Sequence, residues 1–133
     1  GNDQERFNEL FQLFLNGEYR VTQRAAWPLS YSAISHQYFM QKNFRKLLDY
    51  LKKPGLHNSV KRNSIRLMQA IIIPEEFAGE VMELCFTYLA EPKEAVAVKA
   101  FSLTVLEKLS KKYPEIIPEL NYFRTIVLPK HCI

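Results

Sequence analysis

The chain has 133 residues, of which 47% are hydrophobic and 24% charged, with 18 Lys and Arg against 14 Asp and Glu. This length fits one domain with its own core, and the composition excludes wholesale disorder. Two cysteines exclude a disulfide-rich secreted scaffold and fit a reducing compartment, so we expect a cytoplasmic protein. No apolar run reaches the roughly 18–20 residues of a membrane span, and no signal peptide opens the chain. Gly1 in place of Met is typical of a cleaved expression tag, which leaves room for a longer natural protein.

The sequence of the first half of the chain predicts an apolar helix and an amphipathic helix. The segment from Arg6 to Leu15 is apolar nearly all round, so it is either covered by a preceding element or forms a contact between copies, as in a homodimer. Asn43 is the predicted N-cap of a helix over residues 44–53, which Pro54-Gly55 ends. The predicted buried stripe of that helix is Phe44, Leu47, Leu48 and Leu51.

Prolines divide the second half of the chain into helices. Pro74 is the predicted first residue of a helix that ends before Pro92, and Pro92 opens the next helix, which runs to about Lys112. Their apolar stripes are Phe77, Val81, Leu84, Cys85 and Tyr88, then Val98, Ser102, Val105, Leu106 and Leu109. The short run at residues 71–73 fits a helix end better than a strand. The sequence therefore predicts an all-α fold.

Three segments, residues 21–29, 60–68 and 98–106, align as an internal repeat with offsets of 39 and 38 residues. Each carries a small residue at the same place (Ala25, Ser64 and Ser102), which permits close helix approach. A period near 40 with two helices per unit indicates an α-solenoid. We predict a single domain over residues 1–133, right-handed, with helix-pair units at about 5–40, 41–73 and 74–112 and a C-terminal capping helix at 114–128.

The middle unit carries a family resemblance. The helix over residues 44–53, followed by a turn and Val60-Lys-Arg-Asn-Ser-Ile-Arg-Leu-Met-Gln-Ala-Ile71, resembles a HEAT repeat of the armadillo-type helical repeat family. The resemblance covers about residues 7–112 and implies an outer A helix and an inner B helix in each unit. The first unit departs from it, since its connection is three residues shorter and Pro28 lies inside its B helix, where it is expected to kink the helix.

Residues 95–106 and 113–120 are also similar to a small uncharacterised bacterial HEAT-like family, whose members are sometimes labelled adenylosuccinate lyase. That lyase has a Ser-bearing, Gly-rich mobile loop, and this sequence contains none. The similarity therefore implies no lyase activity.

Residues that could carry chemistry are sparse. His36, His57 and His131 are isolated, with no metal-ligand spacing, and Cys85 lies on an apolar stripe as a small core residue. No phosphate-binding loop, dinucleotide fingerprint or nucleophile elbow is present. The acidic cluster Glu75, Glu76, Glu80 and Glu83 predicts a solvated outer face. We therefore expect a non-enzyme without a cofactor or a metal.

The repeat register aligns polar residues across the predicted B helices. If these helices line a concave face, as the HEAT resemblance implies, nine positions form a ladder across it. The candidate partner-binding residues among them are Gln23, Trp27, Arg62, Arg66, Gln69, Thr104 and Glu107, with Ser30 and Ala100 completing the set. Trp and Arg are common binding hot spots. The alternative is that Trp27 belongs to the core and that the arginines form an ordinary solvated face.

Charge is distributed unevenly and leaves two functions open. Residues 41–73 contain eight Lys and Arg against one Asp, whereas residues 74–91 contain five Glu and no Lys or Arg. A protein-interaction or scaffold module with a protein or peptide partner is the preferred hypothesis. The alternative is a nucleic-acid-binding protein, because some HEAT-like proteins are alkylpurine DNA glycosylases that act in DNA alkylation repair. Its basic patch would comprise Lys42, Arg45, Lys46 and Lys61, joined by Arg62 and Arg66.

Overall fold

The computed structural model describes residues 2–16 and 37–131 of the chain. These residues form six α-helices and two short 3-10 turns, with no strand among them. Helix α1 spans Asn2–Asn16, α3 spans Gln37–Leu51 and α4 spans Asn58–Ala70. Helices α5 (Ala78–Ala90), α6 (Val96–Ser110) and α7 (Ile117–His131) complete the fold, which confirms the all-α prediction. The first predicted B helix, with Gln23, Trp27 and Pro28, lies outside the described residues.

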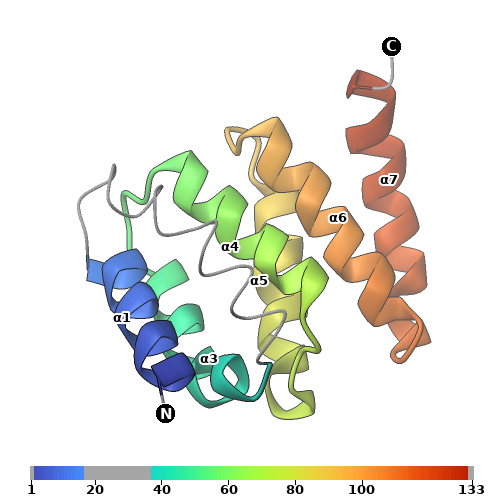
Figure 1. Ribbon diagram of the computed structural model, residues 1–133. Helices are drawn as coiled ribbons and strands as arrows, with labels where there is room; N and C mark the ends of the chain where they lie inside the picture. The colour runs from blue at the N-terminus through green and yellow to red at the C-terminus, as the bar shows by residue number, and fades with distance from the viewer. Residues whose placement is uncertain (1, 17–36, 132–133) are drawn as a thin grey trace.

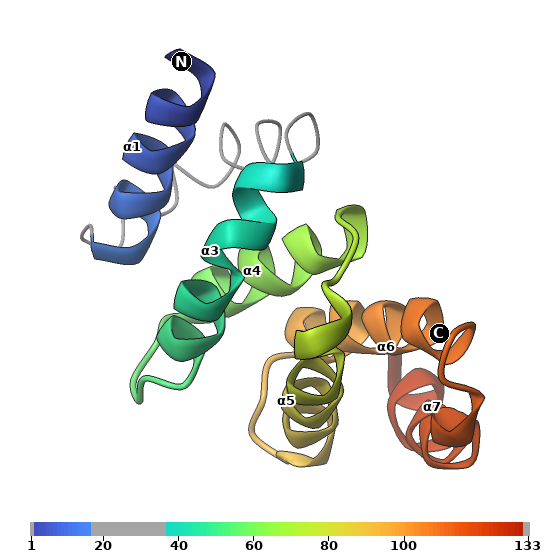
Figure 2. The same cartoon turned by 90° about the horizontal axis from the view of Figure 1, so that it is seen from below.

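The helices pack mainly against elements one or two places away along the chain. Helix α1 packs against α3, α4 packs against α6, and α6 also contacts both α5 and α7. In Figure 1, α4 and α6 lie side by side in front of α5, and α7 stands beyond α6. Figure 2 shows that α1 and α3 run in the same direction at the opposite end of the molecule from α7. This arrangement is consistent with a small helical solenoid.

The core is built from the stripes that the sequence predicts. Phe44, Leu47, Leu48 and Leu51 of α3 are buried, as are Val98, Ser102, Val105, Leu106 and Leu109 of α6. Helix α1 buries one face only, through Phe7, Phe11 and Phe14, and leaves Leu13 43% exposed. The exposed Leu13 leaves apolar surface on α1 outside its buried face. A contact between copies through this helix remains a prediction.

Several predicted helix boundaries are wrong. Asn43 is not an N-cap, because α3 begins six residues earlier, at Gln37. Pro74 precedes a 3-10 turn over Glu75–Phe77, and the α-helix starts only at Ala78. Pro92 does not open a helix: the amide of Glu94 donates to the carbonyl of Glu91 at 3.1 Å in a turn, and α6 starts at Val96. A proline marks a break in a helix, but the turn that follows it sets where the next helix begins.

Other helix ends have clear local causes. His57 is the N-cap of α4, and its Nδ1 accepts a hydrogen bond from the amide of Ser59 at 3.1 Å. Gly55, at φ 76°, supplies the left-handed turn between α3 and α4 that a residue with a Cβ adopts only under strain. Helix α7 follows a 3-10 turn over Pro114–Ile116, buries Leu120, and sets Phe123 with its ring centroid 5.8 Å from that of Phe86. It thus covers the end of the α5–α6 pair.

Candidate interaction surface

The described part of the predicted ladder lies on the exposed sides of α4 and α6, and we call it the α4–α6 face. Arg62 and Arg66 of α4 are exposed, whereas Ser64, two residues from each of them, is fully buried. On α6 the exposed positions are Ala100, Thr104 and Glu107, and Ser102 is buried. The small serines are thus buried, and the register residues lie at the surface. Gln23, Trp27 and Ser30 lie outside the described residues.

Gln69 is the least accessible member of the α4–α6 face. It is half-buried, and its side-chain nitrogen is buried without a hydrogen-bond partner. Such an enclosed donor costs free energy unless it finds an acceptor. Arg62 and Arg66 are therefore the described residues of α4 best placed to meet a partner.

The C-terminal end of α4 is held by a lysine of α6. The ammonium group of Lys108 donates to the carbonyl oxygens of Met68, at 3.2 Å, and of Gln69, at 3.1 Å, and also to that of Ile71. These carbonyls have no partner within the helix, and a cation there also complements the helix dipole. Burial lowers the pKa of Lys108. Lys108 thereby fixes the position of α4 relative to α6 and with it the spacing of the α4–α6 face.

The acidic end of the α4–α6 face is partly neutralised. A carboxylate oxygen of Glu107 lies 3.2 Å from a guanidinium nitrogen of Arg124 on α7, and both side chains are substantially exposed. Glu107 therefore contributes less negative charge to this face than the sequence alone indicates. Lys99 of α6 is half-buried.

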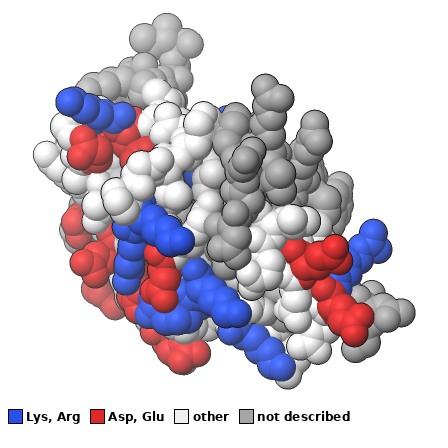
Figure 3. All heavy atoms as spheres, turned by 90° about the vertical axis from the view of Figure 1, so that its left-hand side faces the viewer, with Lys and Arg blue, Asp and Glu red and all other residues white. Residues whose placement is uncertain are grey.

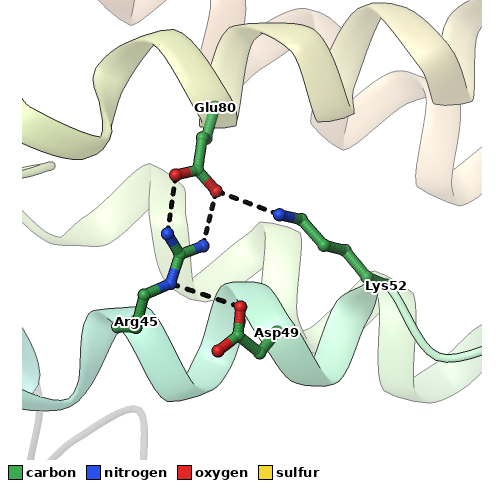
Figure 4. A network of polar contacts seen from close by, with 4 residues as sticks. All are labelled: Arg45, Asp49, Lys52 and Glu80. Atoms are coloured by element: carbon green, nitrogen blue, oxygen red, sulfur yellow. Dashed lines mark hydrogen bonds and ion pairs between the residues drawn. The ribbon is translucent and has the colours of Figure 1, made fainter.

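The predicted acidic outer face is only partly correct. Glu80 of α5 accepts a bidentate pair of hydrogen bonds from Arg45 of α3, at 2.6 and 2.5 Å, and a third from Lys52 at 3.2 Å (Figure 4). Asp49 lies 3.2 Å from Nε of Arg45 in the same network. The hydrogen bonds from Arg45 lower the pKa of Glu80 from 4.5 to about 2. Glu80 is thus a bridge between two units, whereas Glu75, Glu76 and Glu83 are exposed as predicted.

The predicted basic patch is divided by these ion pairs. Arg45 is paired with Glu80 and Asp49, and Lys61 lies 3.1 Å from Glu94, whose side chain is only 5% exposed. Lys42 and Lys46 of α3 are exposed, and Lys42 sits 4.7 Å from the ring centroid of Tyr38. Figure 3, which views the molecule from the side where α1 and α3 lie, shows blue and red side chains interleaved on this face. Positive charge is therefore not continuous along it.

The described cysteine and His57 both have structural positions. Burial raises the pKa of the Cys85 thiol to about 12, and the side chain is fully enclosed, which confirms its place in the core. His57 acts as a helix cap. Residues 2–16 and 37–131 contain no group of His, Cys, Asp or Glu that could hold a metal ion. Within the same residues, no helix is long and apolar enough to cross a membrane.

The comparisons with known proteins define the family. A family model described as a HEAT repeat domain matches residues 1–129, and the chain therefore belongs to the HEAT repeat family. HEAT repeat domains are helical scaffolds that typically mediate protein interactions and are generally non-catalytic. Neither the comparison with curated proteins nor that with solved structures found a match.

Proposed function

We propose that this protein is a non-catalytic interaction or scaffold module that binds a protein or peptide partner through the α4–α6 face. Membership of the HEAT repeat family supports the class of function. The observation that supports the surface is the register of Arg62 and Arg66 on α4 with Thr104 and Glu107 on α6, all of which are exposed, whereas Ser64 and Ser102 are buried. Arginine is one of the residue types that are enriched among interface hot spots.

The charge of the α4–α6 face indicates the kind of partner. Arg62 and Arg66 offer planar guanidinium groups that bind carboxylates in a bidentate manner, while Glu107 is already held by Arg124. A partner with acidic side chains opposite α4 would complement this face. Association through exposed charges is expected to weaken as the salt concentration rises.

The nucleic-acid alternative finds less support in the charge distribution. Of the six basic residues that it invokes, Arg45 and Lys61 are occupied by carboxylates. Neutralising several phosphates requires several available cations, and this set supplies fewer than the sequence predicts. Lys42, Lys46, Arg62 and Arg66 remain exposed, so direct measurement of binding to DNA separates the two functions.

The test uses a double charge reversal, Arg62→Glu with Arg66→Glu. Proteins captured from an extract of the source organism by the immobilised wild type are compared quantitatively with those captured by this variant. The control is Lys93→Glu with Lys111→Glu, which changes the net charge equally at two exposed lysines outside the α4–α6 face. A partner lost by the first variant and kept by the control supports the proposal. A partner kept by both variants contradicts it.

A second measurement addresses the alternative. Anisotropy titration with a labelled DNA duplex and an RNA of equal length, at two salt concentrations, measures affinity for nucleic acid. Tight, salt-dependent binding that disappears in the Arg62/Arg66 charge reversal would replace the protein-interaction proposal with the nucleic-acid function. Absence of binding at low salt, where attraction is least screened, would exclude nucleic acid. Circular dichroism and thermal unfolding verify that each variant is folded.

A further inference from the structure

A second surface feature lies between α1 and α3, away from the residues of the α4–α6 face. It is a groove of about 320 Å³. Helix α1 contributes Gln4, Asn8 and Gln12, helix α3 contributes Lys42, Asn43 and Lys46, and the remaining lining residue is Phe11. Phe11 is 1% exposed and Asn8, Lys42 and Lys46 are exposed, so the groove has an apolar floor and polar walls. We call it the α1–α3 groove.

The described polar side chains that line the α1–α3 groove are of two kinds. Those of α1 are carboxamides, each of which can both donate and accept hydrogen bonds, and α3 carries two ammonium groups. No carboxylate is among the described residues of the lining. The exposed Glu5 and Glu9 belong to α1 but lie outside the lining. The groove is therefore positively charged locally and rich in hydrogen-bonding groups.

The spacing of these side chains matches an extended polypeptide. Gln4, Asn8 and Gln12 follow one another at intervals of four residues, as do Lys42 and Lys46. Four residues of an α-helix rise about 6 Å, and two residues of an extended strand span about 6.6 Å. Because α1 and α3 run in the same direction (Figure 2), both rows of side chains follow the groove at nearly the repeat of alternate residues in a strand.

We propose that the α1–α3 groove binds an extended segment of a partner protein that carries Asp or Glu at every second position. The carboxamides of α1 bind alternate peptide groups of this segment. Lys42 and Lys46 bind its acidic side chains. Lys42 lies against the ring of Tyr38, which restricts its side-chain conformations before binding. Lys42 therefore loses less conformational entropy when it binds.

The chemistry of the α1 wall favours a peptide over a nucleic acid. A peptide backbone offers donors and acceptors in alternation, which carboxamides satisfy in both senses. A phosphate backbone offers acceptors only and is recognised chiefly by cations. The described lining supplies two cations, fewer than a run of successive phosphates would require. The proposal is independent of the α4–α6 face, since no residue belongs to both surfaces.

The test is a titration of the full chain with a fluorescent peptide of about ten residues in which Glu and Ser alternate, a length that exceeds both rows of side chains. A peptide of the same composition with its Glu residues in one block, and a peptide of alternating Lys and Ser, are the comparisons. We expect the alternating Glu peptide to bind several-fold more tightly than the block peptide and the Lys peptide not to bind. Equal affinity for the two Glu peptides would overturn the proposed register.

Three variants locate the binding. Lys42→Glu with Lys46→Glu is expected to weaken it by about tenfold or more, because it reverses both cations of the groove. The matched control, Lys93→Glu with Lys111→Glu, is expected to leave it within about twofold, since those lysines lie outside the groove. Asn8→Ala is expected to weaken binding several-fold, whereas Gln41→Ala, at an exposed position outside the lining, should not.

The remaining outcomes contradict the proposal. If both charge reversals weaken binding equally, the peptide recognises overall charge and not the groove. If a DNA duplex competes with the peptide, loses affinity in Lys42→Glu with Lys46→Glu and is indifferent to Asn8→Ala, the groove binds phosphates. Failure of the wild type to bind the alternating peptide at low salt would also overturn it. Thermal unfolding of each variant excludes loss of fold as the cause.

Discussion

Helix α4 contacts α6, and helix α3 contacts α5. These two contacts are of different kinds. Helices α4 and α6 pack against each other and both carry fully buried apolar side chains, and Lys108 of α6 binds carbonyl oxygens at the end of α4. Helix α3 meets the 3-10 turn over Glu75–Phe77 through the stacked rings of Phe44 and Phe77, whose centroids are 5.4 Å apart, and meets α5 through the partly exposed network around Glu80. Buried apolar contacts stabilise the fold in water at any moderate pH, whereas exposed ion pairs respond to salt and acid. The contact between α4 and α6 therefore contributes more to the free energy of unfolding. The contact between α3 and α5 depends more on salt concentration and pH.

The largest loss of stability is expected from a substitution in α6 that creates a cavity in the core. Leu106 is fully buried on the stripe that joins α6 to its neighbours. Leu106→Ala should lower the free energy of unfolding by about 2–5 kcal/mol, through lost burial and the cavity left behind. Chemical denaturation monitored by circular dichroism measures it, and Thr104→Ala, at an exposed position of the same helix, is the control. A loss no greater than that of the control would show that α6 is not central to the core.

A smaller effect is expected at the lysine that joins α6 to α4. Lys108→Met keeps most of the apolar stem but leaves the carbonyl oxygens of Met68, Gln69 and Ile71 without this donor. The free energy of unfolding should fall by about 1–2 kcal/mol, and amide hydrogen exchange should accelerate at the end of α4. Lys111→Met removes an exposed lysine nearby in the sequence and should have almost no effect. Unchanged exchange at the end of α4 would contradict the role given to Lys108.

The smallest effect at neutral pH, but the clearest dependence on pH, is expected at Glu80. Its pKa is lower in the folded protein, at about 2, than the ordinary value of 4.5, so the unfolded chain binds the proton more readily between these values. The stabilisation is complete above about pH 4.5 and is lost as the pH falls toward about 2. Glu80→Gln should therefore reduce stability slightly at pH 7 and flatten the loss of stability in acid.

Thermal unfolding of wild type and Glu80→Gln at several pH values measures this difference. Glu83→Gln, on the same helix but exposed, is the control. High salt should also reduce the difference in stability between the wild type and Glu80→Gln at pH 7, because Arg45 and Glu80 are both partly exposed to solvent. Parallel profiles of the two proteins in acid would mean that the network does not link the units in solution.

Much of the fold could be predicted from the sequence because burial repeats with a helical period. The stripes of α3 and α6 and the position of Cys85 follow directly from that period, and the aligned serines indicate which helices approach closely. Helix starts were harder to predict, as Asn43 and Pro92 show. Residue types that favour helix caps or turns also occur at positions where they do not begin a helix. At such positions the packing, or the turn that follows, decides where the helix starts. Asn43 is inside α3, where it lines the α1–α3 groove.

The surfaces were less accessible to sequence reasoning. The exposed register of Arg62, Arg66 and Thr104 follows from the repeat, but the pairing of Glu80 with Arg45 depends on how one unit sits against the next. The adjacent basic and acidic stretches were the available signal, since opposite charges in consecutive units are placed to meet. The α1–α3 groove had no such signal, because its amide row becomes visible only when α1 is set beside α3.

The side chains of Arg45, Lys61 and Lys108 form hydrogen bonds to residues at similar separations along the sequence. They join residues 35, 33 and up to 40 positions apart, which is about the length of one repeat. Among the described residues, these groups thus join segments that lie about one predicted repeat apart. An array built in this way can be lengthened by duplicating a whole unit without breaking these bonds, so the extent of its binding surface can change while the way each unit joins its neighbour is preserved.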